Sequence, residues 1–313
     1  MSNKALSFID WLLKQQVLAE HASETVVDWT RIMLEAAPVR FTTPEKAISV
    51  GYLAADLSAA FAIGYQTAIQ CLIPGLPKEQ LYALCVTEDK GASPKVMETR
   101  LTKKNGSLYL SGTKSFVTMG NQVDELLVLA VCEENEFGQK GFTVVRVPFN
   151  AAGVMFKLFD TDLPFVPRVT HAAVMFDEVL LRDNMAIAGE GYKDLVTHFR
   201  PIEDIHVFSA VMGYLWQIAV TYQWSESSKE QILSILALLA QYELEVPVSH
   251  SADLVNAGIF ARFSHLLKEN ECEWDKVDQQ IRRCWDRDVA LLDVASVVRA
   301  KRKEKAWSQV NYS

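Results

Sequence analysis

Two short stretches of this sequence end strand-like runs in hydroxyl-bearing side chains. The stretch LCVTEDKGASP, residues 84–94, places Thr87 ahead of a turn of small and polar residues, and GTKSFVTMG, residues 112–120, places Phe116 close to Thr118. Threonine hydroxyls and strand-end backbone groups supply the hydrogen bonds that the edge of a planar heteroaromatic ring needs, and an aromatic side chain packs against such a ring. The alternative is that both threonines serve strand propensity and that Phe116 belongs to the core.

Composition and charge exclude several classes of protein. The 313 residues include 31 Lys and Arg against 39 Asp and Glu, a net charge of −8, which disfavours nucleic-acid binding because phosphate contacts require a basic surface. We interpret the one basic run, residues 299–305, as the solvated end of a C-terminal helix. The five cysteines are scattered without metal-ligand spacing, which predicts free thiols and no metal site. Neither a signal peptide nor a membrane-spanning apolar run stands out, so we expect a cytoplasmic protein.

The spacing of apolar residues divides the chain into three regions. Residues 1–80 have the period of an N-terminal helical domain, and residues 191–313 have that of a C-terminal helical bundle with short connections. Between them, residues 81–190 change to short runs of strand length, which favour a compact antiparallel barrel or sandwich. Asn105-Gly106 between two such runs predicts a tight hairpin, because both turn positions take positive φ. The predicted fold class is therefore α+β.

Four segments in this order resemble the acyl-CoA dehydrogenase family. CVTEDKGAS and GTKSFVTMG are similar to its two flavin motifs, FDEVLLRDNMAIAGEGYKDL is similar to the exit from its middle domain, and FRP stands at the start of its central helix. The resemblance implies an N-terminal helical domain, a middle antiparallel β-barrel and a C-terminal helical bundle. It also implies a flavoprotein oxidoreductase of fatty acid metabolism, in which FAD accepts a hydride from the CH–CH group of an acyl thioester such as an acyl-CoA. Homo-oligomers are usual in the family.

The resemblance assigns roles to five residues of the two motifs. Val86 and Thr87 would meet the pyrimidine edge of the flavin. Thr118 would point its hydroxyl toward the flavin atom N5, and Phe116 would pack against the ring system where the family usually has tryptophan. Ser93 would lie near both the flavin and the acyl-carrier end of the substrate.

The catalytic base of the family has no direct counterpart in this sequence. The usual glutamate precedes Gly-Thr in a late loop, and no Glu-Gly-Thr occurs here. The central-helix arginine of the family corresponds to Arg200, which would bind substrate. In a minority of relatives the glutamate directly precedes this arginine, but here Phe199 stands before Arg200. Glu203 lies four residues after Phe199, on the same helix face one turn later, and is the candidate base. The weaker candidates for proton transfer are Asp204, Glu271, Glu273, His198 and His206.

The segments with which the family holds the diphosphate of FAD, Arg-x-x-Phe-Gly and a Gly-Gly, are also absent. Their loss removes charge-assisted hydrogen bonds, which implies that FAD binding is weakened or lost. Three functions stay open. The first is the acyl thioester oxidoreductase. The second is a non-catalytic homologue that serves as a binding or scaffolding subunit and pairs with a full-length dehydrogenase. The third is a monooxygenase-type relative, in which no carboxylate base is needed.

Overall fold

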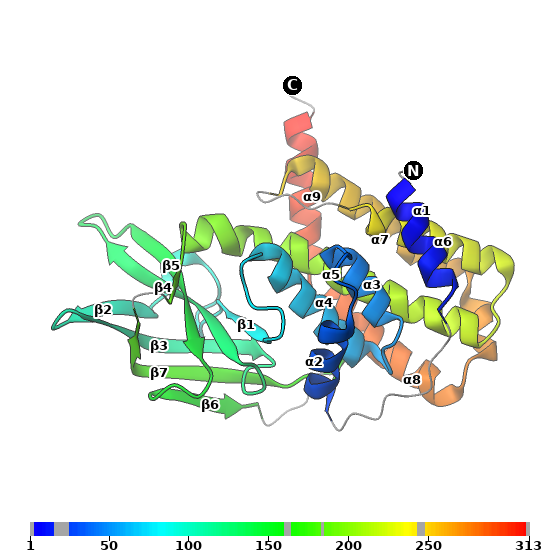
Figure 1. Cartoon of the computed structure of the whole chain (residues 1–313). Coiled ribbons are helices and arrows are strands. Elements are labelled where there is room, and N and C mark those ends of the chain that lie inside the picture. The colour runs from blue at the N-terminus through cyan, green and yellow to red at the C-terminus, as the bar shows by residue number, and fades with distance from the viewer. Residues whose placement is uncertain (1–2, 16–24, 160–163, 183–184, 243–247, 311–313) are drawn as a thin grey trace. The chain divides into compact units, whose positions relative to one another are not determined.

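The chain forms two compact units in a computed structural model (Figure 1). The helical unit consists of residues 1–75, 163–168 and 200–313, and the sheet unit consists of residues 76–162 and 169–199. No helix in the described part of the chain is long and apolar enough to cross a lipid bilayer. The structure describes residues 3–15, 25–159, 164–182, 185–242 and 248–310.

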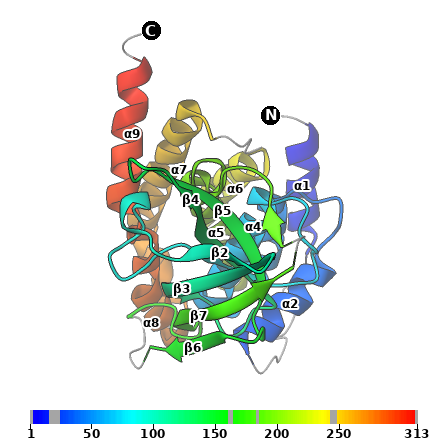
Figure 2. The ribbon, with the colours of Figure 1, turned by 90° about the vertical axis from the view of Figure 1, so that its left-hand side faces the viewer.

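The sheet unit contains one eight-stranded sheet among its described residues (Figure 2). Its strands follow one another in the order β6-β7-β3-β2-β4-β5-β8, and β1 pairs with β4 beside this path. Two short helical segments belong to the same unit, a 3₁₀ turn at Pro94–Val96 and a π-helical turn at Gly191–Val196. The strands are β1 (Tyr82–Cys85), β2 (Arg100–Lys104), β3 (Ser107–Thr118), β4 (Glu125–Glu134), β5 (Lys140–Pro148), β6 (Val154–Leu158), β7 (His171–Leu181) and β8 (Ala186–Ile187).

The predicted antiparallel barrel is wrong in two respects. The sheet is not closed, since β6 and β8 end its order, and β4 pairs in parallel with both β1 and β2. Residues 86–124 connect β1 to β4 and residues 105–124 connect β2 to β4; both connections contain β3 and are long enough for the crossover that parallel neighbours need. The predicted hairpin is confirmed: β2 and β3 pair antiparallel around Asn105 and Gly106, whose φ angles are 50° and 83°.

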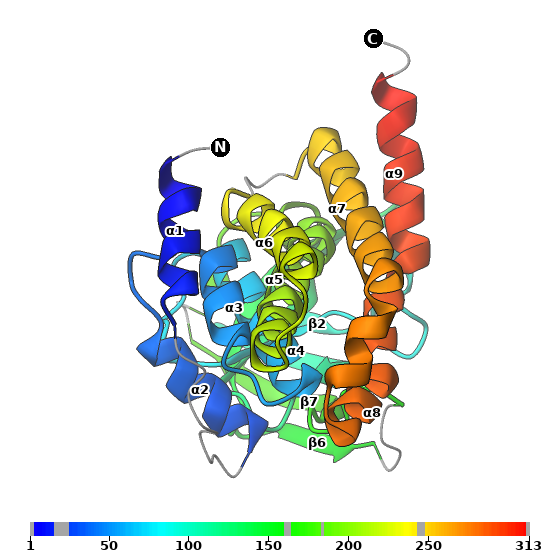
Figure 3. The same cartoon turned by 90° about the vertical axis from the view of Figure 1, so that its right-hand side faces the viewer.

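The helical unit packs around α5, which is buried from Pro201 to Trp216. Helix α4 is buried over nearly its whole length, and α7 lies beside α9 (Figure 3). Polar side chains begin several helices: Thr42 and Glu45 form a capping box at α3, and Asp56 caps α4. The helices are α1 (Asn3–Leu13), α2 (Val26–Ala36), α3 (Thr43–Gly51), α4 (Leu57–Leu72), α5 (Thr197–Thr221), α6 (Glu226–Ala240), α7 (His250–Glu269), α8 (Gln279–Asp288) and α9 (Ser296–Val310), with 3₁₀ segments at Glu271–Lys276 and Val289–Asp293.

Glycine allows α4 to approach the backbone of α5 closely. A Cβ atom at Gly64 would lie 2.4 Å from Cα of Val207, which neither helix can accept without moving. We expect Gly64→Ala to lower the free energy of unfolding by about 1–3 kcal/mol, as overpacking of a core does. A Cβ atom at Gly258 in α7 would meet no atom within 4 Å, so Gly258→Ala should leave stability unchanged or raise it by up to ~1 kcal/mol. Urea unfolding measures the free energy of unfolding of both variants. Equal changes in Gly64→Ala and Gly258→Ala would contradict the close packing of α4 against α5.

Candidate functional site

The two strand ends singled out in the sequence are neighbours in the sheet unit. Beyond the end of β1, the carbonyl of Thr87 accepts a hydrogen bond of 2.7 Å from the backbone N–H of Ser115 in β3. The carbonyl of Val86 accepts one of 3.1 Å from the ammonium of Lys114. Both residues that follow β1 are therefore tied to β3 a few residues before Thr118. We call the surface formed by Val86, Thr87, Phe116, Thr118 and His171 the strand-end surface.

A buried ion pair lies beneath this surface. Nζ of Lys114 is 2.8 Å from Oε1 of Glu88, and the two side chains are 0% and 8% exposed. The carboxylate also accepts backbone hydrogen bonds from Glu98 and Thr99, at 2.8 and 3.1 Å. Burial by itself would raise the pKa of Glu88, but Lys114 and the backbone donors outweigh it and the pKa is lowered. Glu88 is therefore charged at neutral pH and joins β3 to the turn after β1.

A β-bulge in β3 turns Phe116 outward. Lys114 pairs with Val174 and Val117 pairs with Ala172. Three residue steps on β3 therefore match two on β7, and β3 accommodates one extra residue. Phe116 has a φ of 58°, a strained conformation for a bulky side chain, and its side chain is 56% exposed. Its ring contacts those of Phe159 and His171, with centroid separations of 5.0 and 5.8 Å. Strained backbone of this kind is concentrated at functional sites.

Thr118 is paired with a histidine that the sequence did not identify. Its hydroxyl oxygen lies 3.2 Å from Nε2 of His171, the residue opposite it on β7. Nδ1 of His171 lies 3.2 Å from the carbonyl of Val169. Burial lowers the pKa of His171, so the imidazole is neutral at neutral pH. His171 is 53 residues from Thr118 in sequence, and only the pairing of β3 with β7 brings the two together.

Ser93 lies in the same unit but in an exposed turn. It directly precedes the 3₁₀ segment that begins at Pro94, and its carbonyl accepts the backbone N–H of Val96 at 3.1 Å. Nothing in this local geometry selects it for a ligand, and its role at the acyl-carrier end of a substrate stays a prediction.

In the helical unit, the candidate base Glu203 is buried in α5 beside a cation. Nη1 of Arg200 lies 2.7 Å from its Oε2, and the arginine side chain is about half exposed at 47%. Burial raises the pKa of Glu203; Arg200 opposes this shift and Asp204 adds to it. A carboxyl group with a raised pKa suits proton transfer near neutral pH. The charge of Arg200 stabilises the carboxylate form of Glu203.

Four of the five weaker candidates lie in the helical unit. Asp204 is buried and forms ion pairs with Arg299 at 3.3 Å and Arg302 at 2.5 Å, both from α9. The interpretation of residues 299–305 as a solvated helix end is therefore wrong for these two arginines. Glu273 is buried and accepts hydrogen bonds from Ser225 and Ser228, whereas Glu271 is exposed and pairs with Arg282. His206 is fully buried, and His198, in the sheet unit, has a pKa lowered by burial.

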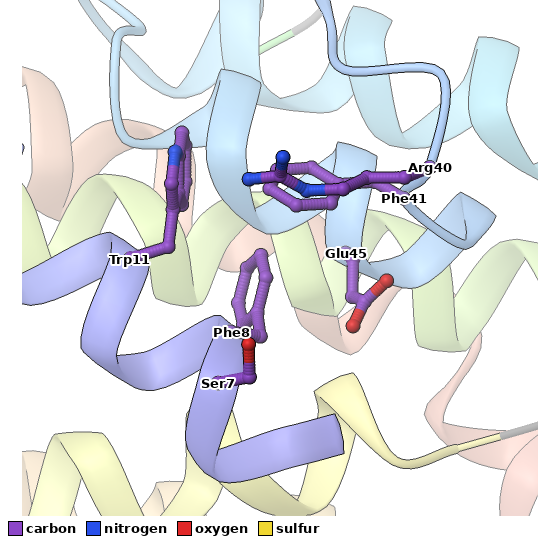
Figure 4. Close-up of a pocket in the computed structure, with 6 residues that line it drawn as sticks. All are labelled: Ser7, Phe8, Trp11, Arg40, Phe41 and Glu45. Atoms are coloured by element: carbon purple, nitrogen blue, oxygen red, sulfur yellow. The ribbon is translucent and has the colours of Figure 1, made fainter. Parts of the chain in front are cut away.

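A pocket at the N-terminal helices is too small for a cofactor. It has a volume of about 110 Å³, whereas sites for drug-sized ligands measure roughly 300–1,000 Å³. Figure 4 shows aromatic rings of α1 facing the segment before α3, where the guanidinium of Arg40 lies over the Phe41 ring at 5.3 Å. The rings of Phe8 and Trp11 in α1 pack against Phe41, with centroid separations of 5.2 and 4.8 Å. The residues that line the pocket are Ser7, Phe8, Trp11, Arg40, Phe41 and Glu45. Among the residues that the structure describes, no three or more His, Cys, Asp or Glu gather as metal ligands.

The strand-end surface fits a flavin ring system better than it fits the diphosphate. An exposed aromatic ring, a partly exposed hydroxyl and a strand-end backbone lie together, as the face and polar edge of a tricyclic ring require. The donors around them are already used: Lys114 binds Glu88 and Val86, and Ser115 Oγ binds Asp89 at 2.6 Å. No contact within this surface supplies a cationic cradle for phosphate.

Comparisons with known proteins find a matching family model and solved structures of similar fold. Residues 83–179 match the family model "Acyl-CoA dehydrogenase, middle domain", and no curated protein matches the chain. Butyryl-CoA dehydrogenase from Megasphaera elsdenii is 14% identical with a TM-score of 0.62, over 98% of both chains. The prolyl acyl carrier protein oxidase AnaB is 13% identical with a TM-score of 0.68, over 97% of this chain and 99% of its own. PigA with FAD and proline is 13% identical with a TM-score of 0.68, over 99% of this chain and 98% of its own.

Identities this low show a shared fold rather than a shared activity. The match to the middle-domain model covers the strand-end surface itself, including Thr87, Phe116 and Thr118. The resemblance seen in the sequence is thus confirmed: residues 83–179 match the middle domain of the acyl-CoA dehydrogenase family, and the chain shares the fold of solved structures that include a butyryl-CoA dehydrogenase.

Proposed function

We propose that the chain is an FAD-dependent oxidoreductase of acyl-CoA dehydrogenase type that acts on the CH–CH group of an acyl thioester. The observation that carries the proposal is the bulge at Phe116, which exposes its ring next to His171, the hydrogen-bond partner of Thr118, at the cost of a strained backbone. Val86, Thr87, Phe116 and Thr118 would hold the flavin ring. Structural neighbours described as a butyryl-CoA dehydrogenase and as PigA with FAD support both the substrate class and the cofactor.

Glu203 is the proposed base. FAD, when bound, would supply the acceptor for the β-hydride of the substrate, and Glu203 would accept the α-proton as the carbon–carbon double bond forms. Burial raises the pKa of Glu203, and the nearby guanidinium of Arg200 favours the carboxylate that must accept this proton. Arg200 is half exposed, which leaves part of its guanidinium for an anionic group of the substrate.

The second candidate function is a non-catalytic homologue that pairs with a full-length dehydrogenase. Two observations favour it. Arg200 forms an ion pair with the Glu203 carboxylate, and the diphosphate-binding segments are missing from the sequence. A subunit of this kind would need the fold but neither the base nor tightly held FAD. The oxidoreductase would assemble into homo-oligomers, whereas the non-catalytic homologue would pair with a full-length dehydrogenase.

Anaerobic reduction by acyl-CoA separates these functions. We expect the FAD-loaded protein to lose its yellow absorbance when a panel of acyl-CoAs of different chain length is added without oxygen. Glu203→Gln should slow this bleaching by about 10²-fold or more while FAD stays bound, because a positioned general base contributes 10²–10⁴-fold. The matched control is Glu271→Gln, at an exposed glutamate that already pairs with Arg282, which should bleach at the wild-type rate.

Each outcome decides between the candidates. Bleaching that is lost in Glu203→Gln and kept in Glu271→Gln supports the oxidoreductase with Glu203 as base. Unchanged bleaching in Glu203→Gln removes Glu203 from the mechanism. FAD-loaded protein that no acyl-CoA bleaches contradicts the oxidoreductase and favours the non-catalytic subunit.

A further inference from the structure

The hydrogen bonds of His171 fix which of its two ring nitrogens carries the proton. A backbone carbonyl can only accept, so Nδ1, at 3.2 Å from the carbonyl of Val169, must be the N–H. A neutral imidazole has one proton, and Nε2 therefore carries a lone pair. The ring of Phe116 from β3 contacts His171 and also contacts Phe159, the residue after β6. Burial lowers the pKa of His171, and the Val169 carbonyl opposes that shift.

This tautomer sets the direction of the hydrogen bond to Thr118. The hydroxyl oxygen lies 3.2 Å from Nε2, and a proton must stand between the two atoms, since otherwise two lone pairs would face each other. Thr118 therefore donates its only proton to His171. Its oxygen keeps lone pairs with which it can accept a hydrogen bond, but it has no proton left to donate to a ligand.

We propose that His171 is a positioning residue that makes Thr118 an acceptor, so that the strand-end surface prefers reduced over oxidised flavin. N5 of oxidised flavin has a lone pair and needs a donor, whereas N5 of two-electron-reduced flavin carries hydrogen and needs an acceptor. The inference rests on the proposed function, in which Thr118 faces N5. A hydroxyl without His171 would be free to donate or to accept and would not discriminate in this way.

The test compares the affinities of the whole protein for the two forms of FAD. Dissociation constants are measured without oxygen for oxidised FAD and for dithionite-reduced FAD. We expect His171→Phe to weaken reduced FAD relative to oxidised FAD by about tenfold, which lowers the midpoint potential of bound flavin by about 30 mV for a two-electron couple. In a Thr118→Val background the same substitution should change the ratio by less than twofold, because the hydroxyl on which it acts is gone. An unchanged ratio in His171→Phe, or an equal change in both backgrounds, overturns the inference.

A second measurement needs neither a variant nor FAD. Nitrogen-15 NMR of the ligand-free wild-type protein reports the tautomer of His171, and the inference requires Nδ1–H with Nε2 unprotonated. A proton on Nε2 overturns it while leaving the proposed function to its own test. If the wild-type protein takes up neither form of FAD, the proposed function falls and the flavin preference falls with it.

Discussion

Lys114→Met is expected to lower the free energy of unfolding by about 3–5 kcal/mol, the loss typical when one member of a buried ion pair is removed. The reason is that Glu88 would keep its charge in a site where its side chain is only 8% exposed. The ties from Lys114 to Val86 and Glu88 would also be lost, so the segment after β1 should detach from β3. Urea unfolding measures the free energy, and amide hydrogen exchange of residues 86–88 measures the detachment.

An exposed ion pair in the same unit is the matched control. Nζ of Lys90 lies 2.6 Å from Oε1 of Glu98, as close as in the buried pair, but both side chains are about two-thirds exposed. Lys90→Met should therefore leave the free energy of unfolding unchanged within error. Restoring neutrality in Lys114→Met/Glu88→Leu should recover part of the lost stability, because no charge is then left buried. Equal losses for Lys114→Met and Lys90→Met would contradict the role of the buried pair.

His206 is expected to make the helical unit unstable in mild acid. It is fully buried in α5, its Nδ1–H donates to the carbonyl of Ile202 at 2.7 Å, and its Nε2 accepts from Thr43 at 2.8 Å. Burial lowers its pKa from 6.5 to about 4. The folded protein thus binds a proton less readily than the unfolded chain. Stability is full above pH 6.5 and falls as the pH drops toward 4, by about 2 kcal/mol at pH 5 and about 3 kcal/mol at pH 4.

The difference between wild type and His206→Gln isolates this contribution. Carboxylates titrate in the same range in both proteins, but glutamine does not ionise, so the variant should lose about 3 kcal/mol less between pH 7 and pH 4. Urea unfolding at several pH values measures the slopes. His265→Gln is the control, because His265 in α7 is 71% exposed and pairs with Glu269. A variant at His206 with the same pH slope as the wild type would show that the histidine is not held neutral.

Local patterns in the sequence predict the strands and one hairpin, but not the pairing of strands that are distant in sequence. Asn105-Gly106 predicts the hairpin between β2 and β3, because the conformation of this turn depends on two adjacent residues. The strand ends at Thr87 and Thr118 are also predictable, because each is marked by residues next to it in the sequence. The parallel pairing of β1 with β4 could not, since residues 82–85 and 125–128 are brought together by the rest of the sheet.

The residues that hold the candidate site together were missed because their types usually indicate solvent. Lys114 and Glu88 look like surface charges until burial and mutual contact are known. The sequence places Arg299 and Arg302 in a basic run typical of a solvated helix end, and only the packing of α9 in the helical unit brings them to Asp204. His171 carried one weak signal, its place at the start of a strand-like run. Its partner Thr118 follows from a bulged register that no local pattern encodes.

The central claim, that the strand-end surface binds the flavin ring, is tested most directly by equilibrium dialysis of the protein against FAD. Phe116→Asn should fold normally, because asparagine tolerates the positive φ of this position better than phenylalanine does. Phe137→Asn, at a phenylalanine 81% exposed in the same unit, is the control. We predict one FAD bound per chain in the wild type and in Phe137→Asn, with at least tenfold weaker binding in Phe116→Asn. No uptake by the wild type, or equal uptake by all three proteins, would contradict the claim.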